Sequence, residues 1–276
     1  MTGRRRSIPI AALAVPVLAG LAYLIALGAP ATYPAINAGA LALATLWIAL
    51  APQSLSVLAR RIGIVAALAL LFLPLLTGPA VGDIARWVPL GPFALHTGFL
   101  AVPVLCVLVG EEPGHAPAIL SLAVLAALLQ PDMATAAALM LAAVGLADAT
   151  RDWRYVAFSV VAFVVALVAA MHGELPPQAF VERVIWLLAR SQPVAALALL
   201  AAIAVSFYLI VSMPGGTAPS RKALAGSLFG FSFAGLVSNY PSPLIGYGAA
   251  PILGFGLALG MLREGMPAEL SDHRRV

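Results

Sequence analysis

Residues 116–146 read APAILSLAVLAALLQPDMATAAALMLAAVGL, and this stretch decides the fold class. Two apolar runs, 116–129 and 133–146, flank the polar tripeptide Gln130-Pro131-Asp132. A carboxylate that faces lipid costs about 2.5 to 3.5 kcal/mol on insertion scales, so Asp132 is expected at a turn on a membrane surface or in a buried functional site. Function is therefore sought on the side of the membrane where this turn lies.

The composition of the whole chain indicates a polytopic membrane protein. Hydrophobic residues make up 62% of the 276 residues and charged residues only 9%, whereas soluble domains carry about 25% charged residues. The Ala/Leu/Val runs lack the alternation of a β-barrel, and backbone groups in hydrocarbon must be satisfied within each helix. The predicted fold class is all-α: a transmembrane helical bundle that forms a single integral membrane domain over residues 1–276.

Pro/Gly and charge clusters divide the chain into about ten apolar segments. These segments are residues 8–28, 35–50, 62–76, 95–110, 116–129, 133–146, 155–171, 184–211, 223–237 and 249–262. Several are shorter than the roughly 20 residues of an upright span, so flanking residues must extend them. The first segment exceeds the signal-peptide core of about 7 to 15 residues and is expected to be a retained helix.

The basic residues orient the bundle. With the N-terminus in the cytoplasm, twelve of the 15 lysines and arginines lie inside, and only Arg86, Arg183 and Arg190 lie on or near the outer face. This excess follows the positive-inside rule and predicts both termini, with the tail 264–276, in the cytoplasm. The clusters sit at segment ends, so the net charge of +4 does not indicate nucleic-acid binding. The predicted outer loops are residues 30–34, 78–93, 130–132, 172–183 and 238–248.

Three of these outer segments resemble the SEDS family of cell-wall proteins (shape, elongation, division and sporulation). Residues 82–91, GDIARWVPLG, are similar to the family's Gly-x-x-Arg-Trp-x-x-x-Gly loop. Residues 129–136, LQPDMATA, are close to its Leu-Gln-Pro-Asp-Leu-Gly-Thr-Ala. Residues 241–248, PSPLIGYG, are similar to its Pro-x-Pro-x-Ile-Ser-Tyr-Gly segment. The order, spacing and common side of the three segments make the resemblance specific over about residues 60–263.

The resemblance implies a function in the bacterial inner (cytoplasmic) membrane. SEDS proteins have ten membrane helices with cytoplasmic termini. They polymerise glycan strands from the undecaprenyl-linked precursor lipid II, usually alongside a class B penicillin-binding protein. The resemblance therefore implies peptidoglycan glycosyl transfer in cell shape or division, with membrane lipid, lipid II and such a penicillin-binding protein as partners and no nucleic acid.

The chain departs from the family pattern where catalysis is expected. The family's large outer loop ends in Leu-Pro-x-x-His-Thr-Asp-Phe, and its Asp is the proposed catalytic carboxylate. Here the loop is reduced to residues 172–183, HGELPPQAFVER, and Glu182 falls at the position of that Asp. Glu182 is thus the candidate general base. The alternative is an interfacial residue paired with Arg183 or Arg190. Elsewhere, Gln-Pro-Ser-Glu of the family is replaced by residues 96–99, HTGF, and a Ser by Gly246.

Further polar and aromatic residues of the outer loops are candidate substrate contacts. Guanidinium groups match phosphate oxygens, so Arg86 and Arg183 are candidates for the diphosphate. Asp132 either caps the helix that begins near Met133 or contacts substrate. His96 has no evident carboxylate partner in the sequence and is expected to be structural. The candidate substrate-binding residues are Arg86, Trp87, Gln130, Asp132, Arg183, Ser242 and Tyr247, of which Trp87 and Tyr247 also fit interfacial anchors.

No motif predicts a metal centre or cofactor. HExxH, CxxC and glycine-rich phosphate loops are missing, and Cys106 is the single cysteine. The sequence leaves open whether the protein binds a divalent cation. The small residues of 226–235 predict a helix-packing surface. Besides a SEDS-type glycosyltransferase, the sequence leaves two other functions: a non-catalytic scaffold or lipid-carrier-binding subunit and, ranked last, a small-solute transporter, which would need paired ionisable groups at the membrane midplane.

Overall fold

A computed structural model describes residues 2–262 except 53, 83, 92 and 113. Asp83 of the first motif, Arg263 and the tail 264–276 lie outside the described residues, as do the side chains of Arg4 and Arg5. The predictions that rest on them stay predictions.

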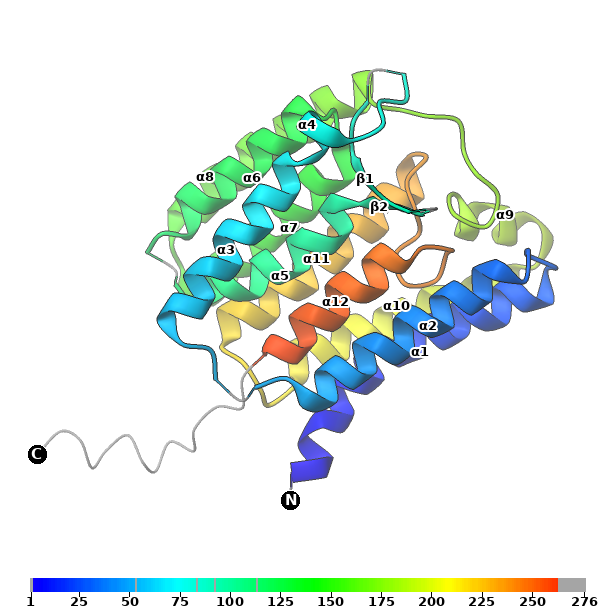
Figure 1. The fold of residues 1–276 in the computed structure, drawn as a ribbon, viewed down its shortest axis with the longest axis horizontal. Helices are drawn as coiled ribbons and strands as arrows, with labels where there is room; N and C mark the ends of the chain where they lie inside the picture. Colours follow the sequence, from blue (N-terminus) through cyan, green and yellow to red (C-terminus); the bar gives the residue numbers. More distant parts are fainter. Residues whose placement is uncertain (1, 53, 83, 92, 113, 263–276) are drawn as a thin grey trace, which may run out of the picture.

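Helices form most of the described chain (Figure 1). They are α1 (Thr2–Ala26), α2 (Thr32–Leu50), α3 (Val57–Phe72), α4 (Pro74–Thr77), α5 (Thr97–Gly110), α6 (Ala116–Leu129), α7 (Met133–Thr150), α8 (Trp153–His172), α9 (Val184–Ser191), α10 (Pro193–Ser212), α11 (Ala218–Val237) and α12 (Ala249–Met261). Two short antiparallel strands, β1 (Trp87–Leu90) and β2 (Phe93–His96), form a hairpin before α5. Every predicted apolar segment coincides with one or two of these helices.

The protein is a multi-span helical membrane protein. Within the described residues, six helical stretches are long and apolar enough to cross a membrane: α1, α2, α3 with α4, α7, α8 and α10. Helices α5, α6 and α12 are apolar but shorter, as their segments predicted. The all-α prediction is confirmed.

The centre of the bundle consists of α5, α7, α11 and α12 (Figure 1). In α5 every residue except Leu100 is buried, which fits a helix that is apolar on all sides. Helix α11 lies directly against the backbone of α7. A Cβ at Gly226 would overlap the Leu141 carbonyl, and a Cβ at Gly230 would overlap the Ala137 carbonyl. The predicted packing surface of small residues is therefore confirmed.

The eighth predicted segment, 184–211, is two helices and not one. Helix α9 ends at Ser191, and α10 begins at Pro193 after the non-helical residue Gln192. Proline is tolerated in the first turn of a helix because the N–H that it lacks would have no helical partner there. Val184, Ile185 and Leu188 form the buried face of α9, so this short helix packs on the bundle by itself.

The two ends of the bundle differ in charge. At one end, which we call the basic end, Arg6 donates to the carbonyls of Ile48 and Ala51, and Lys222 pairs with Asp148. The opposite loop end carries the hairpin, the turn at 130–132 and the loops 173–183 and 238–248 (Figure 1). Arg86, Arg183 and Arg190 belong to this loop end. For the basic residues whose side chains the structure describes, the predicted grouping is present, whereas the side that faces the cytoplasm stays a prediction.

Candidate functional site

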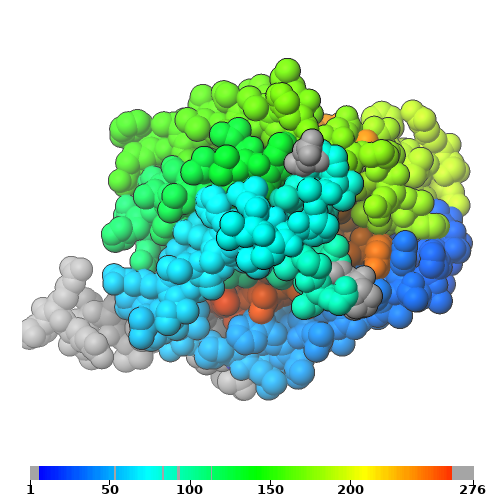
Figure 2. Space-filling view, turned by 45° about the horizontal axis from the view of Figure 1, so that its top comes forward, coloured from blue at the N-terminus to red at the C-terminus, as the bar shows by residue number. Residues whose placement is uncertain are grey.

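The loop end contains a cavity of about 520 Å³. Its walls come from the hairpin, the loop 173–183, the loop 238–248 and the first turns of α2 and α12. In the space-filling view, the orange segment around the start of α12 is visible between the cyan hairpin region, the yellow-green loop and the blue helices (Figure 2). Among the residues that line this loop-end cavity are Trp87, His96, Glu182 and Tyr247.

Glu182 is the acidic side chain among the described lining residues. Its Oε2 accepts a hydrogen bond of 2.7 Å from the Gln178 backbone N–H. Burial raises the pKa of Glu182, although that hydrogen bond and the positive charges of Arg86 and Arg183 act in the opposite direction. A partly desolvated carboxylate with a raised pKa is the form that a general base requires.

The backbone around Glu182 is held against the loop 238–248. Ser242 N–H donates to the Val181 carbonyl at 2.9 Å, and Tyr247 N–H donates to the Phe180 carbonyl at 2.8 Å. Gly246 permits this approach, because a Cβ there would lie 2.8 Å from the Val181 oxygen. The glycine that replaces the family's serine therefore fits the shortened loop.

Asn37 anchors the same region from α2, and sequence reasoning missed it. Its amide donates to the Gly246 carbonyl at 2.9 Å and accepts from the Gly248 N–H at 3.0 Å. The side chain is fully buried. An amide near the start of an apolar segment, at the third residue of 35–50, was the available signal, because polar groups in such segments face protein partners.

Arg86 is buried among backbone carbonyls. Its guanidinium group donates to Pro131 at 2.6 Å, to Gln130 at 3.4 Å and to Gly173, and it lies 4.8 Å from the centre of the Tyr240 ring. Only 3% of the residue is exposed. The guanidinium thus joins the hairpin, the turn at 130–132 and the loop 173–183, and its donors are used by the protein.

Asp132 and Gln130 are also structural in their contacts. The Asp132 carboxylate accepts the Thr135 N–H at 3.1 Å and the Thr135 hydroxyl at 2.5 Å, so it caps α7 as the helix-start interpretation predicted. Gln130 donates to the Leu71 carbonyl at the end of α3. Both side chains are buried, and neither is among the lining residues of the loop-end cavity.

Arg183 stands at the rim of the loop end with about half of its side chain exposed. Its guanidinium group donates to the Asn239 side chain and lies 3.9 Å from the Glu174 carboxylate. Arg183 therefore pairs with these residues and not with Glu182, which was one of the predicted alternatives. Arg190 stacks on Trp186. Of the two predicted phosphate contacts, Arg86 is buried and Arg183 remains accessible to solvent.

The two predicted aromatic contacts both line the cavity. Trp87 pairs with His96 across the hairpin, and their rings meet edge to face at 5.9 Å. Tyr247 stacks on Tyr33 with ring centres 3.8 Å apart. Aromatic faces of this kind are common supports for sugar-sized ligands in concave sites.

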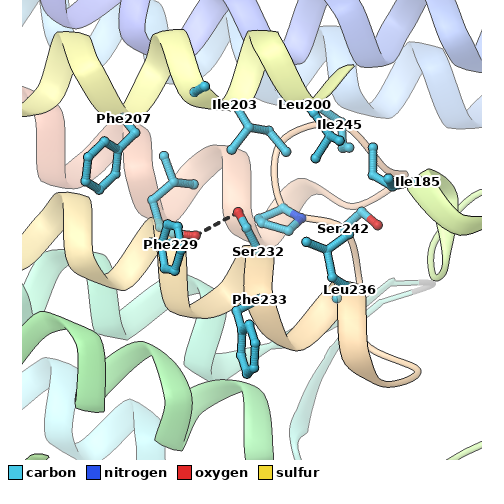
Figure 3. A pocket seen from close by; sticks show the side chains of 14 residues that line it. Ile185, Leu200, Ile203, Phe207, Phe229, Ser232, Phe233, Leu236, Ser242 and Ile245 are labelled. Atoms are coloured by element: carbon cyan, nitrogen blue, oxygen red, sulfur yellow. Dashed lines mark hydrogen bonds between the residues drawn. The ribbon is translucent and has the colours of Figure 1, made fainter. Parts of the chain in front are cut away.

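Ser242 lies elsewhere, beside a second cavity of about 420 Å³ between α10 and α11. Figure 3 shows this cavity, with Phe207 of α10 on one side, Phe229 and Phe233 of α11 on the other, and Ser242 near its end. Its lining is almost entirely apolar. The sequence-predicted residues therefore separate: Trp87, Glu182 and Tyr247 meet in one cavity, and Ser242 borders another.

No metal centre is formed by the residues that the structure describes. Within them, no group of three or more His, Cys, Asp and Glu side chains could hold an ion. Cys106 is buried in α5.

Comparison with known proteins gives matches of structure only. No family model and no curated protein matches the chain. The crystal structure of the rod shape determining protein RodA from Thermus thermophilus matches with a TM-score of 0.68 and 22% identity, over 91% of this chain and 93% of that chain. An aspartate-to-alanine mutant of that protein gives 0.69 and 21%, over 93% and 95%. A peptidoglycan synthase complex that coordinates polymerization and crosslinking gives 0.59 and 20%, over 92% and 96%.

These matches extend over nearly the full length of both chains, and RodA is a SEDS protein. The chain therefore has the SEDS-like fold of RodA.

Proposed function

We propose that this protein is a SEDS-type component of bacterial cell-wall synthesis that binds lipid II in the loop-end cavity and polymerises its glycan. The observation that carries the proposal is the position of Glu182. Its carboxylate lines a cavity of a size suited to a ligand head group, beside two aromatic rings, and burial raises its pKa. The basic end would then lie in the cytoplasm and the cavity at the outer surface of the inner membrane.

In the proposed reaction Glu182 removes the proton from the attacking sugar hydroxyl of one glycan. The freed oxygen forms the new glycosidic bond to the anomeric carbon of the second glycan. The bond from that carbon to the diphosphate breaks, and undecaprenyl diphosphate leaves with the electron pair. Arg183, with its access to solvent, is the described cation best suited to stabilise the leaving diphosphate.

A class B penicillin-binding protein is the proposed partner. Support comes from the fold match to a peptidoglycan synthase complex in which polymerization and crosslinking are coordinated. The pathway would be cell shape or cell division.

A second candidate function is a non-catalytic subunit that binds the lipid carrier for a partner enzyme. The observation that favours it is the hydrogen bond from the Gln178 backbone to the Glu182 carboxylate, since this bond occupies one of the oxygens that a base would use.

Reconstitution into liposomes with lipid II tests both candidates, with binding and glycan polymer measured on the same sample. The variants are Glu182→Gln and, as a matched control at the basic end, Glu112→Gln. Polymer from the wild type and the control but not from Glu182→Gln, with binding retained, supports the enzyme. Binding without polymer in the wild type, also with the partner present, supports the carrier-binding subunit. Polymer formation by Glu182→Gln rejects Glu182 as the base. A wild-type protein that does not bind lipid II rejects both functions.

A further inference from the structure

Helix α9 lies where a membrane span begins. It ends at Ser191, and α10, which is long and apolar enough to cross a membrane, starts at Pro193 (Figure 1). With eight residues α9 is about 12 Å long, so it cannot cross a hydrocarbon core of about 30 Å. Val194 and Leu197 in the first turns of α10 are exposed, as lipid-facing residues are. Helix α9 is therefore placed at the membrane surface of the loop end.

One face of α9 is fixed to the bundle. Val184, Ile185 and Leu188 are buried, and they form a cluster with residues of α10 and with Ile245 of the loop 238–248. Other residues of that loop line the loop-end cavity. The position of α9 is thus set by the protein, and the opposite face is presented outward.

The opposite face exposes two large apolar side chains and one charge. Trp186 and Leu187 are 52% and 54% exposed, and Arg190 is exposed as well. Successive residues of a helix are turned by about 100°, so these three side chains lie within an arc of about 100°. Tryptophan and leucine beside an arginine are typical of a helix that lies in the membrane interface.

Arg190 carries a positive charge that the described protein does not neutralise. The neighbouring Arg183 lies 3.9 Å from Glu174, whereas no carboxylate among the described residues pairs with Arg190. Its guanidinium carbon lies 5.6 Å from the centre of the Trp186 ring. The indole N–H donates to the Leu236 carbonyl at 2.7 Å, so the ring that supports the guanidinium is itself held by α11. A guanidinium group positioned in this way matches the oxygens of a phosphate.

We propose that the exposed face of α9 docks onto anionic phospholipid, with Arg190 bound to the headgroup phosphate and with Trp186 and Leu187 at the boundary of the acyl chains. Charge complementarity selects this occupant, because a basic side chain is attracted to an anionic membrane surface and a zwitterionic surface has no such net charge. The lipid around α10 supplies the apolar phase for the two apolar side chains. The inference goes beyond the proposed function and does not depend on lipid II.

Quenching of tryptophan fluorescence by brominated lipids measures the docking. The protein is placed in phosphatidylcholine liposomes that contain the same small fraction of either dibromo-phosphatidylglycerol or dibromo-phosphatidylcholine. The difference between each protein and its Trp186→Phe variant isolates the signal of Trp186 from those of the other three tryptophans. Both lipids should quench Trp186. The relative association constant should be about fivefold higher for the anionic lipid, which is the gain expected from one arginine near negative headgroups.

Three arginine variants separate charge from structure. Arg190→Gln should lose the fivefold preference but keep the quenching by dibromo-phosphatidylcholine, because the buried face still holds α9 in place. Arg190→Lys keeps the charge and should keep most of the preference. Arg154→Gln removes an exposed arginine at the basic end that pairs with Asp152, and as the matched control it should leave the quenching of Trp186 at the wild-type level.

The other outcomes each contradict a defined part of the reasoning. If neither lipid quenches Trp186, α9 does not lie in the membrane interface. Equal quenching by the two lipids, or a preference that survives in Arg190→Gln, overturns the phosphate contact. Displacement of the brominated phosphatidylglycerol by a much smaller amount of undecaprenyl diphosphate assigns this face to the lipid carrier and overturns phospholipid docking. A wild type that shows the preference but does not bind lipid II retains the docking and overturns the proposed function alone.

Discussion

Replacement of Arg86 by methionine should destabilise the fold strongly. The guanidinium group donates to the carbonyls of Pro131 and Gly173, with a longer contact to Gln130, and lies over the Tyr240 ring. Methionine fills much of the same volume but donates no hydrogen bond. Three segments of the loop end would then lose the group that joins them.

The size of the effect follows from these contacts. A hydrogen bond to a charged group contributes about 1.5 to 3 kcal/mol, so the two closer carbonyl contacts together account for about 4 kcal/mol. For a chain of this length that loss lowers the unfolding temperature by roughly 10 °C. Arg86→Lys keeps the charge but lacks the fork of donors and should lose about half as much.

Thermal unfolding in detergent, followed by tryptophan fluorescence, measures the change, and lipid II binding is measured on the same samples. The buried geometry predicts that stability falls in the order wild type, Arg86→Lys, Arg86→Met. An Arg86→Met protein that unfolds at the wild-type temperature but no longer binds lipid II would refute the argument, and it would restore the phosphate contact that the sequence suggested.

Three other changes test the remaining parts of the structure. Burial raises the pKa of Glu182 in the folded protein. Below the unfolded-state pKa of about 4.3, the wild type should therefore be as stable as Glu182→Gln. As the pH rises through the folded-state pKa, the wild type should become less stable than Glu182→Gln, which unfolding at several pH values measures. Gly226→Ala should cost about 1 to 3 kcal/mol in unfolding experiments, because its Cβ meets the backbone of α7. The matched Gly39→Ala, which points into open space, should be neutral or gain up to about 1 kcal/mol, and equal effects at the two glycines would contradict the packing argument. Gly246→Ser should loosen the loop 173–183 and speed its cleavage by protease, and an unchanged cleavage rate would show that the Val181 contact is unimportant.

The membrane fold could be predicted because its signals are local. Each apolar segment is a continuous run, and the basic residues at the segment ends sort the loops to two sides. The break between α9 and α10 could not be predicted in this way. Pro193 is compatible with a kink inside one helix or with the start of a new one, and the packing of α9 on distant residues decides between them.

The site was predictable only in part, for a similar reason. The sequence shows which residues are polar, and Glu182, Trp87 and Tyr247 do meet in one cavity. It does not show which backbone carbonyls will surround Arg86, because these come from the turn at 130–132 and from Gly173. Nor does it show that His96 lies beside Asp132, since that contact depends on how α5 and α7 pack.

The close contact of α7 and α11 bears on how such a chain can diverge. Where Gly226 and Gly230 touch the backbone of α7, a larger side chain has no room. Over the lipid-facing surface, one apolar residue can replace another at little cost, as at the exposed Leu43, Val65 and Val160. Only a few positions thus require one particular residue, whereas the arrangement of the helices is fixed along the whole bundle. Mutation can therefore erase the resemblance of two such sequences before it alters their shape, consistent with a TM-score of 0.68 at 22% identity.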